Sequence, residues 1–268
     1  MNTAIILIAA VFLIPILFFA GLVVYANILM LKRPFLRLYE MRKAEEDYCP
    51  VEKVPKLFIH FLLQIEDRYF YEHPGFLREN IRDAIALNLK AKKIISGGST
   101  ITQQLAKNLY FNFRKNYLRK AAEFIITLSI EKKMSKDEIL DLYMNLIYFG
   151  NGLYGITDGC AFYFGKKPWE LTTNQMFIMA CAPYAPTKGN IFRYPEVFER
   201  IRNKRLDLLK KRGEISKEDE ELIRSYRAAE LDPELRKNDE FTLDYPDEVC
   251  LNNDRFGPKP VPERVTRS

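Results

Sequence analysis

The longest uncharged stretch of this sequence lies near its start. No charged residue occurs from residue 4 to residue 31, and about 20 apolar residues are enough to cross a bilayer as a helix. A cleaved signal peptide would begin with basic residues and have a shorter apolar region, whereas Met1-Asn2-Thr3 contains neither Lys nor Arg. We therefore expect residues 4–31 to form a retained transmembrane anchor.

Basic residues bear on the orientation of this anchor and on the partners of the chain. Five of them follow the span and favour a cytoplasmic position for that side: Lys32, Arg33, Arg37, Arg42 and Lys43. Long domains can be translocated despite such charge, so charge alone leaves the orientation open. The net charge of +6 suits an anionic membrane surface or a phosphate-bearing substrate. No helix-turn-helix, zinc-finger or aromatic ribonucleoprotein pattern supports a nucleic-acid partner.

Helical periodicity dominates the sequence after the span. Residues 32–54 are expected to form a juxtamembrane connector, and a helix is predicted to begin at Pro55 and to end near His73-Pro74-Gly75. Five further helices are predicted, over residues 101–110, 118–132, 139–147, 174–182 and 196–211. Strand-like alternation is scarce, so the sequence predicts a single, mainly α-helical domain over residues 55–231.

Local capping patterns support several of these helix starts. A hydroxyl acceptor stands three residues before a reciprocating side chain in three places: Thr100 with Gln103, Ser135 with Glu138, and Thr172 with Gln175. Residues 232–268 are polar and contain several prolines, which predicts an extended or disordered tail. Four cysteines, Cys49, Cys160, Cys181 and Cys250, are too widely spaced for a paired metal motif and leave free thiols or disulfides open.

The first motif that could carry chemistry is Glu66-Asp67-Arg68-Tyr69-Phe70-Tyr71-Glu72-His73-Pro74-Gly75. If this segment is helical, Glu66, Phe70 and His73 share one face. A carboxylate beside apolar neighbours can have its pKa raised toward the range that suits a general base. The alternative is a charge cluster at a helix end, with His73 capping carbonyl groups.

The second motif is Gly97-Gly98-Ser99-Thr100-Ile101-Thr102-Gln103-Gln104-Leu105-Ala106-Lys107-Asn108. Two glycines lead into a capped helix, whose start is expected to offer free backbone amides to an anion. On that helix, hydroxyl, amide and ammonium groups form one polar face, apart from a buried apolar face. The alternative is a capped surface helix with a solvated polar side. The Gly-Lys-Ser/Thr ending of a nucleotide-binding loop is missing, so no nucleotide cofactor is expected.

The third motif is Arg119-Lys120-Ala121-Ala122-Glu123, in which two cations lie three and four residues from a carboxylate. Such a group could hold a pyrophosphate directly and through a divalent metal ion. The same spacing also occurs in ordinary helix salt bridges, which contribute a few tenths of a kcal/mol.

In this order, the three motifs resemble those of the peptidoglycan glycosyltransferases, the family that also provides the polymerase domain of bifunctional penicillin-binding proteins. The resemblance continues through Lys136-Asp137-Glu138-Ile139-Leu140-Asp141-Leu142-Tyr143-Met144-Asn145 and residues 149–156 and 163–166, and covers roughly residues 55–212. Three departures occur: Asp141 stands where the family usually has Glu, Gly159-Cys160 where it has paired Ala, and Cys181-Ala182-Pro183 where it has Gly-Leu-Pro. A Ser-x-x-Lys match at Ser129 lacks the other penicillin-binding motifs downstream and is interpreted as structural.

The resemblance implies a lysozyme-like helical fold and a role for each matched residue. Glu66 would be the general base that deprotonates the acceptor sugar's 4-hydroxyl, supported by Asp67, Phe70 and His73. Glu123 would be the second acid and would assist at the donor pyrophosphate, with a divalent cation such as Mg²⁺ or Mn²⁺. The remaining matched side chains would bind the pyrophosphate (Lys107, Arg119, Lys120) or line the donor site (Ser99, Thr100, Gln103, Gln104).

The function implied by the resemblance is an inverting hexosyl transfer. A lipid-linked growing glycan strand would be the donor and the lipid-linked disaccharide precursor the acceptor, on the outer side of the bacterial cytoplasmic membrane, with other cell-wall synthesis proteins as further partners. Two alternatives stay open, a lysozyme-like glycan hydrolase and a noncatalytic scaffold that binds the precursor. The predicted phosphate-binding cations favour the transferase, because cleavage of a polymeric glycan expels no pyrophosphate.

Overall fold

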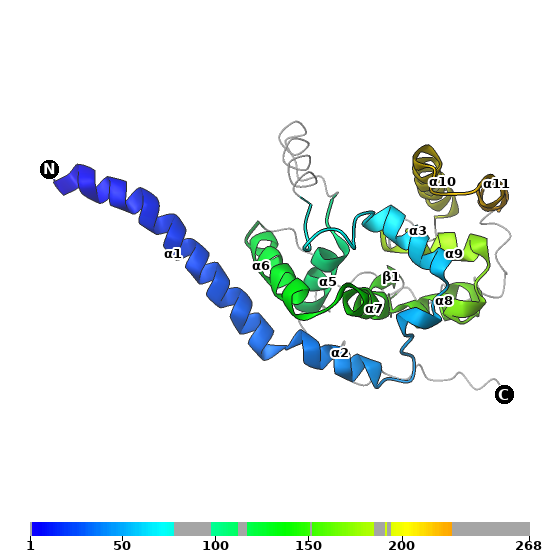
Figure 1. Cartoon of the computed structure of the whole chain (residues 1–268), viewed down its shortest axis with the longest axis horizontal. Helices are drawn as coiled ribbons and strands as arrows, with labels where there is room; N and C mark the ends of the chain where they lie inside the picture. Colours follow the sequence, from blue (N-terminus) through cyan, green and yellow to red (C-terminus); the bar gives the residue numbers. More distant parts are fainter. Residues whose placement is uncertain are drawn as a thin grey trace.

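A computed structural model of the chain describes residues 2–77, 98–111, 117–150, 152–184, 191 and 194–226. Within these ranges the chain forms a helical body from which one long helix projects (Figure 1). The predicted mainly α-helical class is therefore confirmed. The predicted tail over residues 232–268, and Cys250 within it, lie outside the described residues.

The projecting helix is α1 (Asn2–Lys32). It is apolar all round, and side chains of its middle part face outward, with Phe12 67% exposed. Such a surface suits a lipid environment, and this helix is long and apolar enough to cross a membrane. Toward its end α1 packs against α6 (Tyr117–Lys133), and Ala26 is fully buried there. One apolar helix that fits a membrane anchor is thus confirmed, joined directly to the helical body.

The predicted connector contains α2 (Phe35–Lys43) and the 3-10 turn η1 (Val51–Lys53), and both are fastened to α7 (Lys136–Leu146). The buried carboxylate of Asp141 accepts hydrogen bonds from the Tyr39 hydroxyl (2.9 Å), the Val51 amide (2.9 Å) and the Tyr48 hydroxyl. One turn later, Asn145 exchanges two hydrogen bonds with the Cys49 backbone. Asp141, one of the three departures, thus holds the connector on the body.

Most predicted helices occur where periodicity placed them. The structure has α5 (Ile101–Tyr110), α6, α7, α9 (Thr173–Cys181) and α10 (Pro195–Arg212), each within three residues of the predicted ends. All three predicted capping boxes are formed, at Thr100, Ser135 and Thr172. A reciprocal cap satisfies two backbone donors with local side chains, so it fixes a helix start without tertiary help. These predictions are confirmed.

The predicted end of the first helix is wrong. Helix α3 (Lys56–Glu66) stops at Glu66, and the chain then turns through residues 67–75. Asp67 has φ −159° and ψ 76°, outside the helical region. Its carboxylate is drawn away by tertiary hydrogen bonds to the Ile101 amide and the His73 ring, both 2.9 Å. These contacts outweigh the helical pattern.

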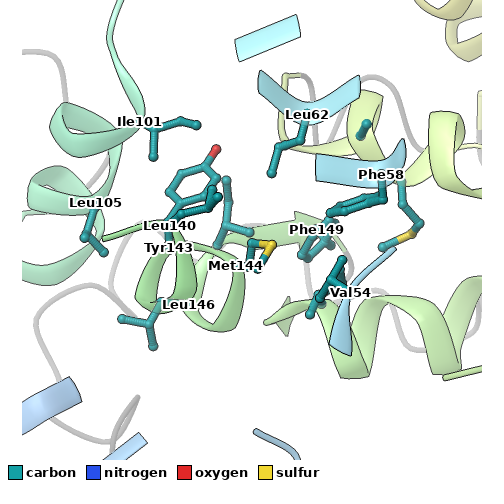
Figure 2. Close-up of a cluster of buried hydrophobic side chains, with 14 of the residues drawn as sticks. Val54, Phe58, Leu62, Ile101, Leu105, Leu140, Tyr143, Met144, Leu146 and Phe149 are labelled. Carbon is teal, nitrogen blue, oxygen red and sulfur yellow. The ribbon is translucent and has the colours of Figure 1, made fainter. Parts of the chain in front are cut away.

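The core gathers around α7, whose residues from Ile139 to Leu146 are all buried. Figure 2 shows side chains of α3, α5, α7 and β1 (Tyr148–Gly150) meeting in one cluster, among them Phe58, Leu62, Ile101, Leu105, Tyr143, Met144 and Phe149. Phe61 of α3 also packs edge-on against Phe177 of α9. A 2.7 Å hydrogen bond from Gln104 to Glu66 joins the first turn of α5 to the end of α3, and α5 packs on α7.

Smaller elements complete the described body. Strand β1 pairs antiparallel with β2 (Leu153–Tyr154), and α8 (Ile156–Phe164) follows. Turns η2 (Pro168–Glu170) and η3 (Ala182–Tyr184) flank α9, and α11 (Lys217–Ser225) packs beside α9 and α10. In the described part of the chain Cys49, Cys160 and Cys181 are buried free thiols.

Candidate active site

Glu66, the predicted general base, is the last residue of α3 and lies against α5. The Gln104 side-chain amide donates a 2.7 Å hydrogen bond to Glu66 Oε2. Oε1 is also buried, and no group in the described residues donates a hydrogen bond to it. Burial raises the pKa of Glu66, while the Gln104 hydrogen bond and the positive charges of Arg205 and Lys107 oppose this rise. A half-buried carboxylate with one oxygen that accepts no hydrogen bond from the described residues suits a proton acceptor.

The three residues predicted to support Glu66 do not share a helix face with it, because residues 67–75 are not helical. His73 Nδ1 accepts from the Gly75 amide (3.0 Å), so its Nε2 carries the hydrogen that points at Asp67. Asp67 also accepts from the Ile101 amide, and Phe70 is fully buried with its ring edge-on to His73. These contacts tie the turn after Glu66 to the start of α5. Asp67, Phe70 and His73 thus support Glu66 indirectly, by fixing the turn that follows it.

The expectation of free amides at the start of α5 is wrong for the amides whose contacts are described. The Thr100 amide donates to the Gln103 side chain, the Ile101 amide to Asp67, and the Gln103 amide to the Thr100 hydroxyl. Thr100 Oγ1 also donates to the Gly75 carbonyl (2.7 Å), and both Thr100 and Gln103 are buried. The two side chains therefore build the helix start, and their contact with a donor substrate stays a prediction.

A second carboxylate, Glu123 of α6, lies within a group of cations. Arg119 Nε is 2.9 Å from Oε1, Lys120 Nζ is 2.9 Å from Oε2, and Glu123 is only 1% exposed. Lys120 Nζ also donates to Ser99 Oγ (3.1 Å), which links this group to the segment before α5. The salt bridge foreseen as the alternative is thus formed. Because its carboxylate is buried, it resembles a desolvated charge cluster more than a solvated surface pair.

Lys107 of α5 connects the two carboxylates electrostatically. Burial lowers the pKa of Lys107. The negative charges of Glu123 and Glu66 raise this pKa, and the positive charges of Arg119 and Lys120 lower it. The Lys107 ammonium group therefore interacts electrostatically with both candidate acids, Glu66 and Glu123. Helices α3, α5 and α6 thus bring together the predicted base and the predicted pyrophosphate-binding cations.

The residues that the structure describes do not by themselves form a metal site. Over the described ranges, no group of three or more His, Cys, Asp or Glu side chains could hold a metal ion. Glu123 offers one carboxylate, and both of its oxygens are already paired with cations. The divalent cation therefore stays a prediction, and the chemistry below does not depend on one.

Two residues that interact electrostatically with Glu66, Arg205 and Cys181, were not among the predicted site residues. The positive charge of Arg205, on α10, acts to lower the pKa of Glu66, and α10 packs against α3. Cys181 of α9 also feels both charges, and its pKa is raised to about 12, mainly by burial. Arg205 stands in a helix rich in basic residues, and nothing in that pattern separates it from surface charges.

Comparison with known proteins shows which family this chain belongs to. Residues 34–210 match the family described as Transglycosylase. The chain belongs to this family. A Cupriavidus necator protein named as a transglycosylase is 37% identical over 171 residues, which are 64% of this chain and 72% of that protein. The match begins at residue 34, so it includes α2 as well as the body.

Similar proteins also include much longer ones. Penicillin-binding protein 4 of Bacillus subtilis is 38% identical over 77% of this chain and 32% of its own length. Penicillin-binding protein 1A of Aquifex aeolicus is 39% identical over 64% of this chain and 24% of its own length. The chain thus spans about a third or less of these two relatives. The family match confirms the predicted lysozyme-like helical fold and the resemblance to the glycosyltransferases.

Proposed function

We propose that this chain is a membrane-anchored peptidoglycan glycosyltransferase. It polymerises a lipid-linked disaccharide-peptide precursor into β-1,4-linked glycan strands and releases polyprenyl pyrophosphate. The observation that carries the proposal is the carboxylate of Glu66, which is hydrogen-bonded to Gln104 of α5, while Lys107 on the same helix interacts electrostatically with both Glu66 and Glu123. A general base close to a cationic, anion-binding group is what such a transfer requires.

In the proposed reaction, Glu66 removes the proton from the acceptor's 4-hydroxyl as that oxygen attacks C1 of the donor sugar. The new O4–C1 bond forms while the bond from C1 to the pyrophosphate oxygen breaks on the opposite face, which inverts the configuration. The raised pKa of Glu66 helps, because a stronger base takes the proton more readily.

The leaving pyrophosphate gains negative charge, and Lys107, Arg119 and Lys120 are proposed to stabilise it. Fixed cations in a water-poor site stabilise developing charge more than mobile solvent does. Glu123 holds Arg119 and Lys120 in place through its two 2.9 Å contacts, so they are oriented before the substrate arrives. Ser99 reaches the same group through Lys120.

The anchor supports a substrate that resides in a membrane. Helix α1 continues into α2, which is fastened to α7, so the domain is held at the membrane surface rather than on a loose tether. We propose that the domain lies on the outer side of the bacterial cytoplasmic membrane, beside the lipid-linked precursor and the growing strand. Other cell-wall synthesis proteins are proposed as further partners.

The test is incubation of the purified full-length chain, in detergent, with lipid-linked precursor. Polymer should form, and Glu66→Gln should reduce its rate by at least about 10², the usual contribution of a general base. Glu72→Gln is the matched control, because it makes the same change on an exposed side chain of the turn after α3. Near-normal turnover by Glu66→Gln would remove the base assignment.

The same assay separates the two alternatives. A hydrolase would release fragments from preformed peptidoglycan and make no polymer from precursor. A scaffold would bind precursor tightly and do neither. The cations around Glu123 favour the transferase, because hydrolysis of polymeric glycan has no pyrophosphate to stabilise.

A further inference from the structure

A buried tyrosine on α7 is linked to Glu66 through one intervening side chain. The Tyr143 hydroxyl donates to Gln104 Oε1 (3.2 Å), and Gln104 Nε2 donates to Glu66 Oε2 (2.7 Å). Tyr143 is 0% exposed. In Figure 2 its ring lies within the core cluster, and its hydroxyl points between Ile101 of α5 and Leu62 of α3. Three helices thus contribute to one hydrogen-bonded chain that ends on the carboxylate.

The chemistry of the three groups gives this chain a direction. An ionised carboxylate only accepts hydrogen bonds, so Gln104 must turn its amide nitrogen toward Glu66. The amide oxygen then faces Tyr143 and needs a donor. Burial and the charges of Glu66 and Asp67 keep the pKa of Tyr143 well above its ordinary value, so its hydroxyl keeps the hydrogen that it donates. The amide of Gln104 is therefore held in one orientation from both ends.

This arrangement makes the two oxygens of Glu66 different. Oε2 accepts the Gln104 hydrogen bond, whereas Oε1 is buried and receives none from the described residues. We propose that Tyr143 is a positioning residue that acts through Gln104 and fixes the orientation of the Glu66 carboxylate as the base. This inference rests on the proposed function, because it requires Glu66 to be the base.

A purely structural role for Tyr143 is the competing explanation, since its ring fills the core. Tyr143→Phe separates the two, because it keeps the ring and removes only the hydroxyl. We expect turnover to fall by up to about tenfold, the upper end of the effect of losing one hydrogen bond between neutral groups, with KM changed by less than about twofold. Tyr163→Phe is the matched control. Tyr163, on α8, is also buried, and its hydroxyl donates a 2.9 Å hydrogen bond to the buried Phe149 carbonyl.

The pH profile supplies a readout that a structural defect would not move. Glu66 acts as a base only when ionised, and the Gln104 hydrogen bond favours that form. Tyr143→Phe loosens Gln104, so the acidic limb of the rate profile should move to higher pH, and Tyr163→Phe should leave it in place. Besides Tyr143, the charged and titratable groups that act on Glu66 or feel its charge are Arg205, Lys107, Asp67 and Cys181, and neither variant changes them. The position of a limb does not depend on how much enzyme is folded.

A double-mutant cycle tests whether Tyr143 acts through Gln104. If it does, Tyr143→Phe should cost up to about tenfold in the natural background but less than about twofold in a Gln104→Met background. Equal costs in both backgrounds, or an unmoved acidic limb in Tyr143→Phe, would overturn the inference. If Glu66→Gln is inactive in that case, the proposed function still stands. If Glu66→Gln is active, Glu66 is not the base, and the proposed function itself is refuted.

Discussion

Removal of the Asp141 carboxylate should loosen the connector from the body. Asp141 is 4% exposed and accepts three hydrogen bonds, from Tyr39, Tyr48 and Val51. At about 2 kcal/mol for each bond to a charged group, Asp141→Ala would cost about 6 kcal/mol if all three donors were stranded. Tyr48 and Val51 are only half-buried and can reach water, so mainly the buried Tyr39 hydroxyl loses its partner. We therefore expect a loss of about 3 kcal/mol in the free energy of unfolding.

Thermal unfolding of the full chain in detergent, followed by far-UV circular dichroism, measures this loss. For a body of this size, about 3 kcal/mol lowers the Tm by roughly 6–12 °C. The control is Asp137→Ala, on the same helix, where an exposed carboxylate accepts one hydrogen bond from Tyr71. That change should cost less than about 1 kcal/mol. Equal shifts for the two variants would refute the reasoning that buried donors decide the cost.

Three further predictions follow from single features. Gly159→Ala restores the family's usual residue and places a methyl carbon 2.8 Å from Met179 Cε and 3.1 Å from Phe149 Cγ. The free energy of unfolding, measured by thermal unfolding, should fall by about 1 kcal/mol, because overpacking exceeds the gain in helix propensity. Protease added to intact spheroplasts should digest the catalytic domain, and protection until lysis would reverse the proposed orientation. Lys107→Ala should lower the polymerisation rate by about 10²–10³ and weaken precursor binding less. Equal losses in both would mean that Lys107 binds the substrate and the transition state equally well.

Features encoded within a few residues could be predicted from the sequence. The capping box at Thr100 and the ends of α5 need only local spacing and an apolar stripe, and both are observed. The end of α3 could not be predicted, because Asp67 is engaged by a backbone amide 34 positions away, at Ile101. A helical wheel assumes that the helix continues, so it grouped Glu66 with Phe70 and His73 wrongly.

The parts of the site that escaped sequence analysis arise from tertiary contacts. Motif spacing identified Glu66 and Gln104, but not that the amide of Gln104 would lie between Glu66 and Tyr143. The charge of Arg205 likewise reaches Glu66 only because α10 folds back over the end of α3. Helix-start amides were expected to be free because the sequence could not show that Asp67 would take one of them. The roles of the individual side chains in catalysis stay predictions.

The last prediction concerns the pH range of activity. Burial raises the pKa of Glu66 above that of an ordinary glutamate and lowers the pKa of Lys107 below that of an ordinary lysine. The proposed base would work when ionised and the proposed cation when protonated, so the rate should rise with pH through the first pKa and fall through the second. Lys107→Arg tests the second limb, because a guanidinium stays protonated above pH 12. Its maximal rate should fall, since the longer fork fits the same space poorly, but the alkaline limb should move to higher pH and the acidic limb should stay. If the alkaline limb does not move, another group sets it, and Lys107 does not act as the titrating cation.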